Sequence, residues 1–346
     1  CIPPNLILGS FCWLNLSCKL NSWYLKVLPS VFFKDIPTIS LFTYAVFNKA
    51  FISFIEKSKK IKWFQGEKVE SKYFFTVHSE NYFEDIKNKS PKEGSFRIDA
   101  DTILSKYSLE AALKATGSVC KAVDIVFGGK FKNAFCPIRP PGHHAEPQRA
   151  MGFCFFNNIA IAANYAKLKY KINKCAVIDF DVHHGNGTQK MFWNDPNMFY
   201  ASTHQEGIFP GTGFKEETGI NNNIVNVPLP AGTDSLLFKK SYEDIIIPSL
   251  EKFSPDIIFI SAGFDAHIND PLADFRLTKD DFYWITKKLN DFASKYCKGK
   301  LISCLEGGYN IKALSESCLA HVKGLILWIR KKLMTIILII FHLKKL

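Results

Sequence analysis

The stretch that most constrains the fold of this chain is Val177–Gln189, VIDFDVHHGNGTQ. Residues 176–178 are an uninterrupted apolar run, which is typical of a strand buried on both faces of a parallel sheet. Four ionisable side chains follow within six positions: Asp179, Asp181, His183 and His184. Side chains two positions apart on an extended segment project to the same side, so Asp181 and His183 are placed to hold one metal ion.

The rest of the chain predicts an α/β protein. Its 346 residues are 47% hydrophobic and 22% charged, which indicates a globular chain of one large or two small domains. Helices are predicted at 45–62, 79–88, 108–126, 155–168, 236–250, 279–296 and 314–328. Strands are predicted at 74–77, 134–138, 176–180, 199–203, 224–227, 257–260 and 300–304. This alternation predicts βαβ crossovers and a parallel sheet.

Polar side chains follow four of the predicted strands directly. They are His143 and His144, the Asp181/His183 pair, Asp265, and Tyr309 after Gly307-Gly308. Ligands of open parallel sheets bind beyond the carboxyl ends of the strands, so these side chains should converge on one pocket. Two carboxylates and one imidazole, from Asp181, His183 and Asp265, match a catalytic zinc site and can activate water and polarise a carbonyl.

The histidine doublet suits acid–base chemistry. His143 and His144 follow a rigid Pro-Pro-Gly turn, and one can act as a general base while the other stays charged. That division requires different partners, and Asp179 and Asn186 are the candidates. The hydroxyl of Tyr309 can face a developing oxyanion.

Cysteine and charge patterns bound the location and the partners. The ten cysteines are scattered without a C-x-x-C pair, which indicates reduced thiols in an intracellular, reducing compartment, with the cytoplasm favoured over nucleus or organelle. The net charge of +12 lies in the flanks, because 1–72 and 323–346 each contribute an excess of six basic residues. We therefore expect no direct nucleic-acid binding. We also expect no export signal and no transmembrane span, since the apolar run 333–341 is too short to cross a bilayer.

Five ordered motifs resemble the histone deacetylase superfamily, in its class II and bacterial deacetylase-like branch. They occupy 139–163, 177–189, 208–213, 257–267 and 305–310, with weaker similarity at 76–82 and 99–105. The resemblance implies the arginase/deacetylase-like fold, a single parallel sheet of about eight strands flanked by helices on both faces. It covers a catalytic domain at 46–324. Residues 1–45 are an atypical N-terminal segment, and 325–346 form a basic and apolar tail expected to be an anchor, a packed helix or sequence outside the native frame.

The same resemblance implies the roles of individual residues. One zinc ion would bind Asp181, His183 and Asp265, with His144 as general base, His143 as its electrostatic partner and Tyr309 as oxyanion donor. Gly152, Phe153, Phe209 and Gly307 would contact the substrate, with the two phenylalanines lining an acyl-lysine tunnel. Structural potassium would bind at Asp179, Asp181, His183, Ser202 and Thr203, and at a second site made by backbone carbonyls around Phe192, Asp195 and Met198.

The expected activity is zinc-dependent removal of acetyl or related acyl groups from lysine side chains of a protein or peptide. Two alternatives stay open at this point. One is an acetylpolyamine amidohydrolase, and the other is an inactive acyl-lysine-binding protein. The natural substrate and the oligomeric state do not follow from the sequence.

Overall fold

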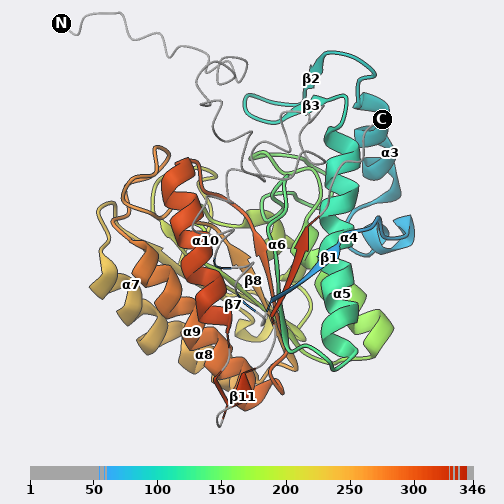
Figure 1. Ribbon diagram of the computed structural model, residues 1–346. Coiled ribbons are helices and arrows are strands. Elements are labelled where there is room, and N and C mark those ends of the chain that lie inside the picture. The colour runs from blue at the N-terminus through green and yellow to red at the C-terminus, as the bar shows by residue number, and fades with distance from the viewer. Residues whose placement is uncertain are drawn as a thin grey trace, which may run out of the picture.

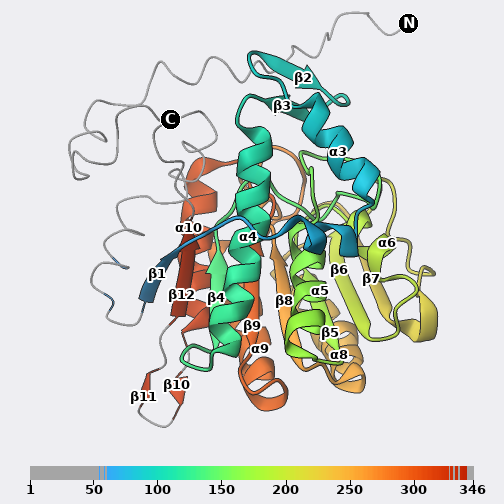
Figure 2. The same cartoon turned by 90° about the vertical axis from the view of Figure 1, so that its right-hand side faces the viewer.

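An eight-stranded parallel sheet forms the centre of the protein (Figure 2). The computed structural model describes residues 54, 58, 61–326, 328–329, 332–333 and 336–340. In spatial order the strands are β1 (Ile61–Gln65), β12 (Ile336–Ile340), β4 (Asn133–Cys136), β9 (Leu301–Leu305), β8 (Ile257–Ala262), β5 (Cys175–Asp179), β6 (Met198–Gln205) and β7 (Ile224–Leu229). The predicted α/β fold with a single parallel sheet is confirmed.

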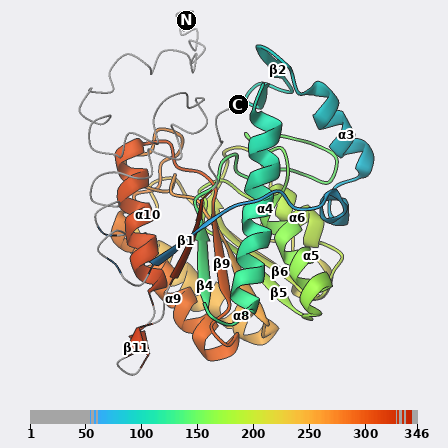
Figure 3. The same cartoon turned by 45° about the vertical axis from the view of Figure 1, so that its right-hand side comes forward.

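Helices cover both faces of this sheet (Figures 1 and 3). One face carries α4 (Ser108–Phe127), α5 (Asn158–Tyr170) and the short α6 (Asn186–Phe192). The other carries α7 (Ser235–Ser241), a π-helical turn (Tyr242–Ile246), α8 (Ile247–Phe253), α9 (Lys279–Tyr296) and α10 (Ile311–Leu325). The helix α3 (Glu80–Lys89), a 3-10 helix (Ser71–Thr76) and the hairpin of β2 (Ser95–Arg97) and β3 (Ile103–Ser105) complete the chain order, with a small pair, β10 (Trp328–Ile329) and β11 (Lys332–Leu333), before β12.

The strands are apolar on both sides because each side faces a separate core. Along β5, Val177 packs into the cluster beneath α4 and α5, whereas Ile178 packs into the cluster beneath α7–α10. Alternate residues of a strand point to opposite faces, so a doubly covered strand must be apolar at every position. This requirement explains the run that opens the signature stretch.

Side-chain caps fix where the helices begin. Ser79 accepts a hydrogen bond from the backbone N–H of Tyr82 at the start of α3, and Asn157 caps α5 in the same way. Thr278 and Asp281 form a reciprocal capping box at the start of α9. The predicted bounds of α9 are confirmed, and α3, α4, α5, α7 and α10 begin within a few residues of the prediction. The short α6 was not predicted, and the helix predicted at 236–250 is divided into α7, the π-helical turn and α8.

Four local predictions differ from the structure. The strand predicted at 74–77 is wrong, since those residues belong largely to the 3-10 helix. Most of the helix predicted at 45–62 lies outside the described residues, and 61–62 belong instead to β1. The hairpin of β2 and β3 has no predicted counterpart. In the described part of the tail, residues 336–340 form the strand β12 and not a packed helix, and β12 pairs in parallel with both β1 and β4.

The carboxyl ends of the central strands are aligned, and this alignment builds the site. Asp179 on β5 is level with Ser202 on β6 and with Ser261 on β8, which is level with Cys304 on β9. The loops that follow these strands therefore leave the sheet at one edge.

No helix within the described part of the chain is long and apolar enough to cross a membrane. The cysteines of that part, which begin at Cys120, are free and buried.

Candidate active site

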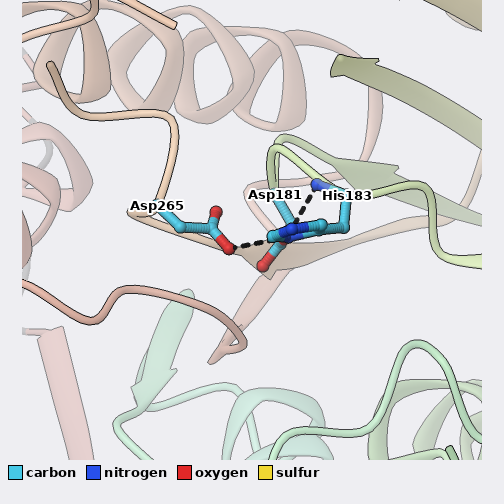
Figure 4. A group of neighbouring side chains, drawn as sticks. All are labelled: Asp181, His183 and Asp265. Carbon is cyan, nitrogen blue, oxygen red and sulfur yellow. Dashed lines mark hydrogen bonds and ion pairs between the residues drawn. The ribbon is translucent and has the colours of Figure 1, made fainter. Parts of the chain in front are cut away.

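Asp181, His183 and Asp265 come together beyond the ends of β5 and β8 (Figure 4). Each offers one ligand atom, and these atoms all lie within 4.8 Å of one another. The Nδ1 atom of His183 is 3.3 Å from Asp181 Oδ1 and 3.1 Å from Asp265 Oδ2. Asp181 and Asp265 are buried, and His183 is almost so. The spacing of two residues and a distant carboxylate thus produce one cluster, as predicted from the strand ends.

Backbone groups orient the two carboxylates of this cluster. Gly307 N–H donates to Asp181 Oδ2 at 2.7 Å, and Val182 N–H donates to Asp265 Oδ1 at 3.0 Å. Two glycines make room for them. A Cβ at Gly263 would lie 2.1 Å from Asp181 Oδ2, and one at Gly307 would lie 2.1 Å from Asp265 Oδ2. Both positions therefore require glycine because a carboxylate occupies the space.

The donor set fits a divalent metal. Burial and the neighbouring carboxylate of Asp181 raise the pKa of Asp265 to about 7, which is a sign of crowded negative charge. A cation bound between the two carboxylates would relieve this repulsion. Two carboxylates and one imidazole are the kind of ligand set that holds a catalytic zinc ion and leaves a position open. His183 would then bind as a neutral imidazole.

His143 lies beside this cluster, and two carboxylates face its ring. Its Nδ1 is 3.0 Å from Asp179 Oδ2, and its Nε2 is 3.9 Å from Asp181 Oδ2. Burial alone would lower the pKa of His143, but the carboxylates of Asp179 and Asp181 outweigh it and raise this pKa to about 10. Tyr200 also donates to Asp179, at 3.0 Å, which fixes that carboxylate.

His144 stacks near His143 but has a neutral partner. The two ring centroids are 4.0 Å apart, and His144 Nδ1 is 2.9 Å from Asn186 Oδ1. Asn186 directs its Nδ2 to Glu146 Oε1 at 3.0 Å, so its oxygen faces the imidazole. The Nδ1–H of His144 therefore donates to Asn186, and its Nε2 is left as the basic nitrogen. Burial, His143 and His183 push the pKa of His144 well below its usual range.

Tyr309 is held at the site through its backbone. Its N–H donates to Asp270 Oδ2 at 2.7 Å, and the same oxygen accepts from Asn310 N–H at 3.2 Å. Arg139 donates to the carbonyl of Gly308 at 3.0 Å and lies 5.7 Å from the centroid of the Tyr309 ring. Burial and the nearby carboxylate of Asp265 raise the pKa of Tyr309, so its hydroxyl keeps its proton.

Phe209 and Phe153 lie beside residues of the site. Phe209 meets His144 edge to face at 5.0 Å between ring centroids, and Phe153 lies 5.7 Å from Tyr309. Gly152, which precedes Phe153, has a φ of +56°. A Cβ at this position would lie 2.5 Å from Cδ2 of His144. Phe209 is 41% exposed, which places it at the rim of the site.

The positions implied for potassium fall into two groups. In the first, Asp179 and Ser202 are neighbours at the ends of β5 and β6, next to Thr203, and near Asp181 and His183. In the second, the carbonyls of Phe192, Asp195 and Met198 all accept hydrogen bonds from Asn223 Nδ2. The three distances are 2.8, 3.0 and 2.7 Å. An ion does not fit at the centre of these carbonyls while the amide nitrogen is there.

A buried glutamate that was not predicted from the sequence fixes the histidine loop. Glu306 is completely buried, and its Oε2 accepts from the N–H groups of Gly142 and His143 at 2.7 and 3.2 Å. Its Oε1 accepts from Ser261 at 3.0 Å. The available signal was an acidic residue directly after the apolar strand β9, inside the motif at 305–310. Asp270 and Arg139 were missed too, and neither has a comparable signal.

Fold and side-chain arrangement together define a protein of the arginase/deacetylase-like class with a candidate metal site. Comparisons with known proteins agree with this class. Residues 45–325 match the model of the histone deacetylase domain. The crystal structure of the HDA15 HD domain superposes with a TM-score of 0.70 at 34% identity, covering 76% of each chain. The chain therefore belongs to the histone deacetylase family.

Curated relatives come from several kingdoms. Histone deacetylase 10, chloroplastic, of Oryza sativa is 39% identical, over 70% of this chain and 57% of its own length. A probable deacetylase of Archaeoglobus fulgidus is 38% identical, over 75% of this chain and 72% of its own. Type-2 histone deacetylase 2 of Dictyostelium discoideum is 39% identical, over 75% of this chain but only 18% of its own. The chain thus spans a fifth to about three quarters of these relatives.

Proposed function

We propose that this protein is a zinc-dependent amidohydrolase that removes acetyl or related acyl groups from lysine side chains of proteins or peptides. The observation that carries the proposal is the pairing of two adjacent buried histidines with different partners beside a carboxylate–imidazole cluster. Asp179 holds His143 as a cation, and Asn186 leaves His144 neutral. One site thus contains a base and an acid side by side, which amide hydrolysis requires.

The proposed steps follow from the hydrogen bonds of each residue. Zinc, held by Asp181, His183 and Asp265, would supply Lewis-acid polarisation of the amide carbonyl and of water. His144 accepts a proton from the attacking water at Nε2, because its Nδ1–H is committed to Asn186. The Tyr309 hydroxyl, which keeps its proton, donates to the oxyanion that develops on the carbonyl.

The departing amine also needs a proton. His143 and the newly protonated His144 are the two adjacent donors for it. Phe153 and Phe209 would exclude water along the acyl-lysine side chain, and Gly152 would accept a hydrogen bond from the substrate amide with its carbonyl. Gly307 has a structural role in this mechanism, because its N–H donates to the Asp181 carboxylate and orients it.

Several further properties are part of the proposal. The catalytic domain would comprise 46–324, with β12 of the tail completing its sheet. Potassium would bind near Asp179 and Ser202 as a structural ion. A reducing compartment suits the seven buried free thiols of the described chain. The exposed rim ring of Phe209 suits an acylated peptide as partner.

The test is hydrolysis of a fluorogenic acetyl-lysine peptide. Three samples are compared: wild type, Tyr309→Phe, and wild type stripped of metal with EDTA. We expect turnover in the untreated wild type and loss of turnover in the other two samples. Adding zinc back to the stripped wild type should restore turnover. Acetylspermidine as substrate separates the polyamine alternative, which is supported if it alone turns over. A zinc-loaded, folded wild type that hydrolyses neither compound overturns the catalytic proposal in favour of acyl-lysine binding.

A further inference from the structure

Behind Phe209, two histidines outside the catalytic set bind the loop that carries this ring. The loop runs from Ile208 to Gly213 (IFPGTG), between β6 and β7. His184 Nδ1 is 2.7 Å from Thr212 Oγ1, and His204 Nε2 is 3.0 Å from the carbonyl of Gly213. Both imidazoles are buried, and their ring centroids are 4.8 Å apart. We call His184 and His204 the loop-anchoring pair.

The hydrogen-bond network assigns the proton of His184. Gln189 Nε2 donates to Glu217 Oε2 at 2.8 Å, and the Gln189 oxygen therefore faces the imidazole. His184 Nε2 is 3.0 Å from that oxygen and must donate to it. The Nδ1 of His184 is consequently the acceptor, and the Thr212 hydroxyl donates to it. Glu217 Oε2 also accepts from Gly213 N–H at 3.1 Å, which adds a third attachment of the loop.

His204 is assigned in the same way. A backbone carbonyl only accepts, so His204 Nε2–H donates to Gly213. Its Nδ1 then accepts from the Ser202 hydroxyl at 2.9 Å. Burial lowers the pKa of His204 to about 4, in agreement with a neutral ring that has one donor and one acceptor satisfied. Each ring of the loop-anchoring pair thus completes a chain from a strand or helix to the loop.

Close packing at Gly213 shows how tightly the loop end rests on these rings. Its φ is +87°, and a Cβ there would lie 2.5 Å from His204 Nε2 and 2.6 Å from His184 Cγ. The loop therefore meets the two imidazoles through bare backbone. On its other side, Phe209 contacts His144 at 5.0 Å and His183 at 6.4 Å between ring centroids. One short loop connects the loop-anchoring pair to the wall of the proposed tunnel.

We propose that His184 and His204 are positioning residues that fix the Phe209 loop and thereby set which acyl groups the site accepts. The selectivity part rests on the proposed function, whereas the attachment of the loop does not. A wall held by fixed hydrogen bonds cannot retreat to admit a longer acyl chain. A wall released from them can, because the loop is exposed on its outer side at Phe209.

Two variants test the attachment. His204→Leu removes the donor to Gly213 inside the core, and Thr212→Val removes only a hydroxyl from an exposed position. The matched control is His321→Leu. His321 is also a buried neutral histidine, bridging Thr286 and Ser303 at 2.6 and 2.8 Å, but it lies on α10. His204→Gln, whose amide can still donate, is the conservative variant.

The first readout is amide hydrogen exchange of peptides covering 206–217, followed by mass spectrometry, which needs no substrate. Exchange in this segment should be about tenfold faster in His204→Leu and Thr212→Val, close to wild type in His204→Gln, and unchanged in His321→Leu. Unchanged exchange in both folded loop variants overturns the proposal.

The second readout is the ratio of kcat/KM for acetyl-lysine to that for butyryl-lysine in the same peptide. It should fall about tenfold in His204→Leu and stay constant in His321→Leu. Faster exchange with an unchanged ratio overturns the selectivity role of the pair. Faster exchange in a protein whose zinc-loaded wild type hydrolyses neither peptide supports the attachment and counts against the proposed function alone.

Discussion

Two groups of histidines lie side by side in this protein and differ in the groups that face their rings. His143 and His183 face carboxylates, and their pKa values are raised to about 10. His184 and His204 face hydroxyl, amide and carbonyl groups, and their pKa values are lowered to about 3 and about 4. His143, His184 and His204 are buried and His183 is nearly so, which means that burial does not separate the two groups. The partner of each ring decides whether burial removes its charge or a carboxylate retains it.

The two groups of histidines therefore have different roles in the site. The carboxylate-bound group gathers charge where a metal and a reacting carbonyl would need it. The neutral group makes directional hydrogen bonds that fix a loop, at no cost in buried charge. His144 stands between the two groups, since it is next to a charged ring but bonds to an amide. That intermediate environment is what a general base requires, and four predictions examine the contrast.

The largest expected effect comes from removing the intermediate histidine. His144→Ala should lower kcat/KM for the acetyl-lysine peptide by about 10²- to 10⁴-fold, because no other neutral imidazole reaches the proposed water. Zinc content, measured by mass spectrometry, should match the wild type. Activity within tenfold of wild type, with zinc bound, would mean that another residue is the base.

Replacing the carboxylate partner of His143 with a neutral amide should make His143 more similar to the neutral histidines. Asp179→Asn removes the carboxylate that stabilises the His143 imidazolium, so the pKa of His143 should fall and kcat/KM should drop about 10- to 100-fold. Histidine NMR titration of the zinc-loaded protein measures the first effect. Asp85→Asn, on the surface of α3, is the control and should change neither quantity. An unaltered His143 titration in Asp179→Asn contradicts this account.

Asn223 is another neutral side chain that satisfies buried polar groups. Its amide nitrogen donates to the backbone carbonyls of Phe192, Asp195 and Met198. Within the described residues the Oδ1 of this buried side chain has no hydrogen-bond partner. Asn223→Ala should destabilise the fold by about 1–3 kcal/mol in choline chloride, because three buried carbonyls lose their donor. Potassium chloride should recover part of that loss in the variant and add less to the wild type. Equal potassium responses in thermal unfolding would refute the idea that the amide takes the place of an ion.

The smallest expected effect concerns His321, a neutral histidine outside the two groups compared above. Burial lowers the pKa of His321 to about 3, against 6.5 in an unfolded chain. The unfolded state then binds more protons between these values, so stability is complete above about pH 6.5 and declines as the pH falls. Between about pH 7.5 and 5.5 this group should cost about 1.4 kcal/mol of unfolding free energy. Denaturant titrations of wild type and His321→Gln measure it, and an equal acid sensitivity of both would contradict the prediction.

Much of the site could be predicted because its residues follow strand ends. Asp181 and His183 are two positions apart in the sequence, and Asp265 is far from both. A parallel sheet nevertheless brings the carboxyl ends of its strands to one edge, so the three side chains meet there. The alternation of strand and helix was enough to infer that edge. The pairing of His143 with Asp179 and of His144 with Asn186 is likewise as the residue types suggested.

Other features were not predictable because their signal is not local. Glu306 and Asp270 act by accepting backbone hydrogen bonds from segments distant in sequence, which no periodicity records. The strand β12 joins the sheet between β1 and β4, a position that depends on the partners available and not on its own apolar run. The segment 74–77 is apolar enough for a strand but forms part of a 3-10 helix, with Phe74 packed in the core.

The sequence by itself determined the class of fold and predicted both the candidate metal-binding cluster and the paired histidines, since each depends on residue types at strand ends. The tertiary structure decided which groups surround each histidine. Adjacent residues such as His183 and His184 point to different surroundings, one to carboxylates and the other to Thr212 and Gln189. A pKa is set by groups within a few ångströms in space, and in a βαβ fold most of those groups come from other strands.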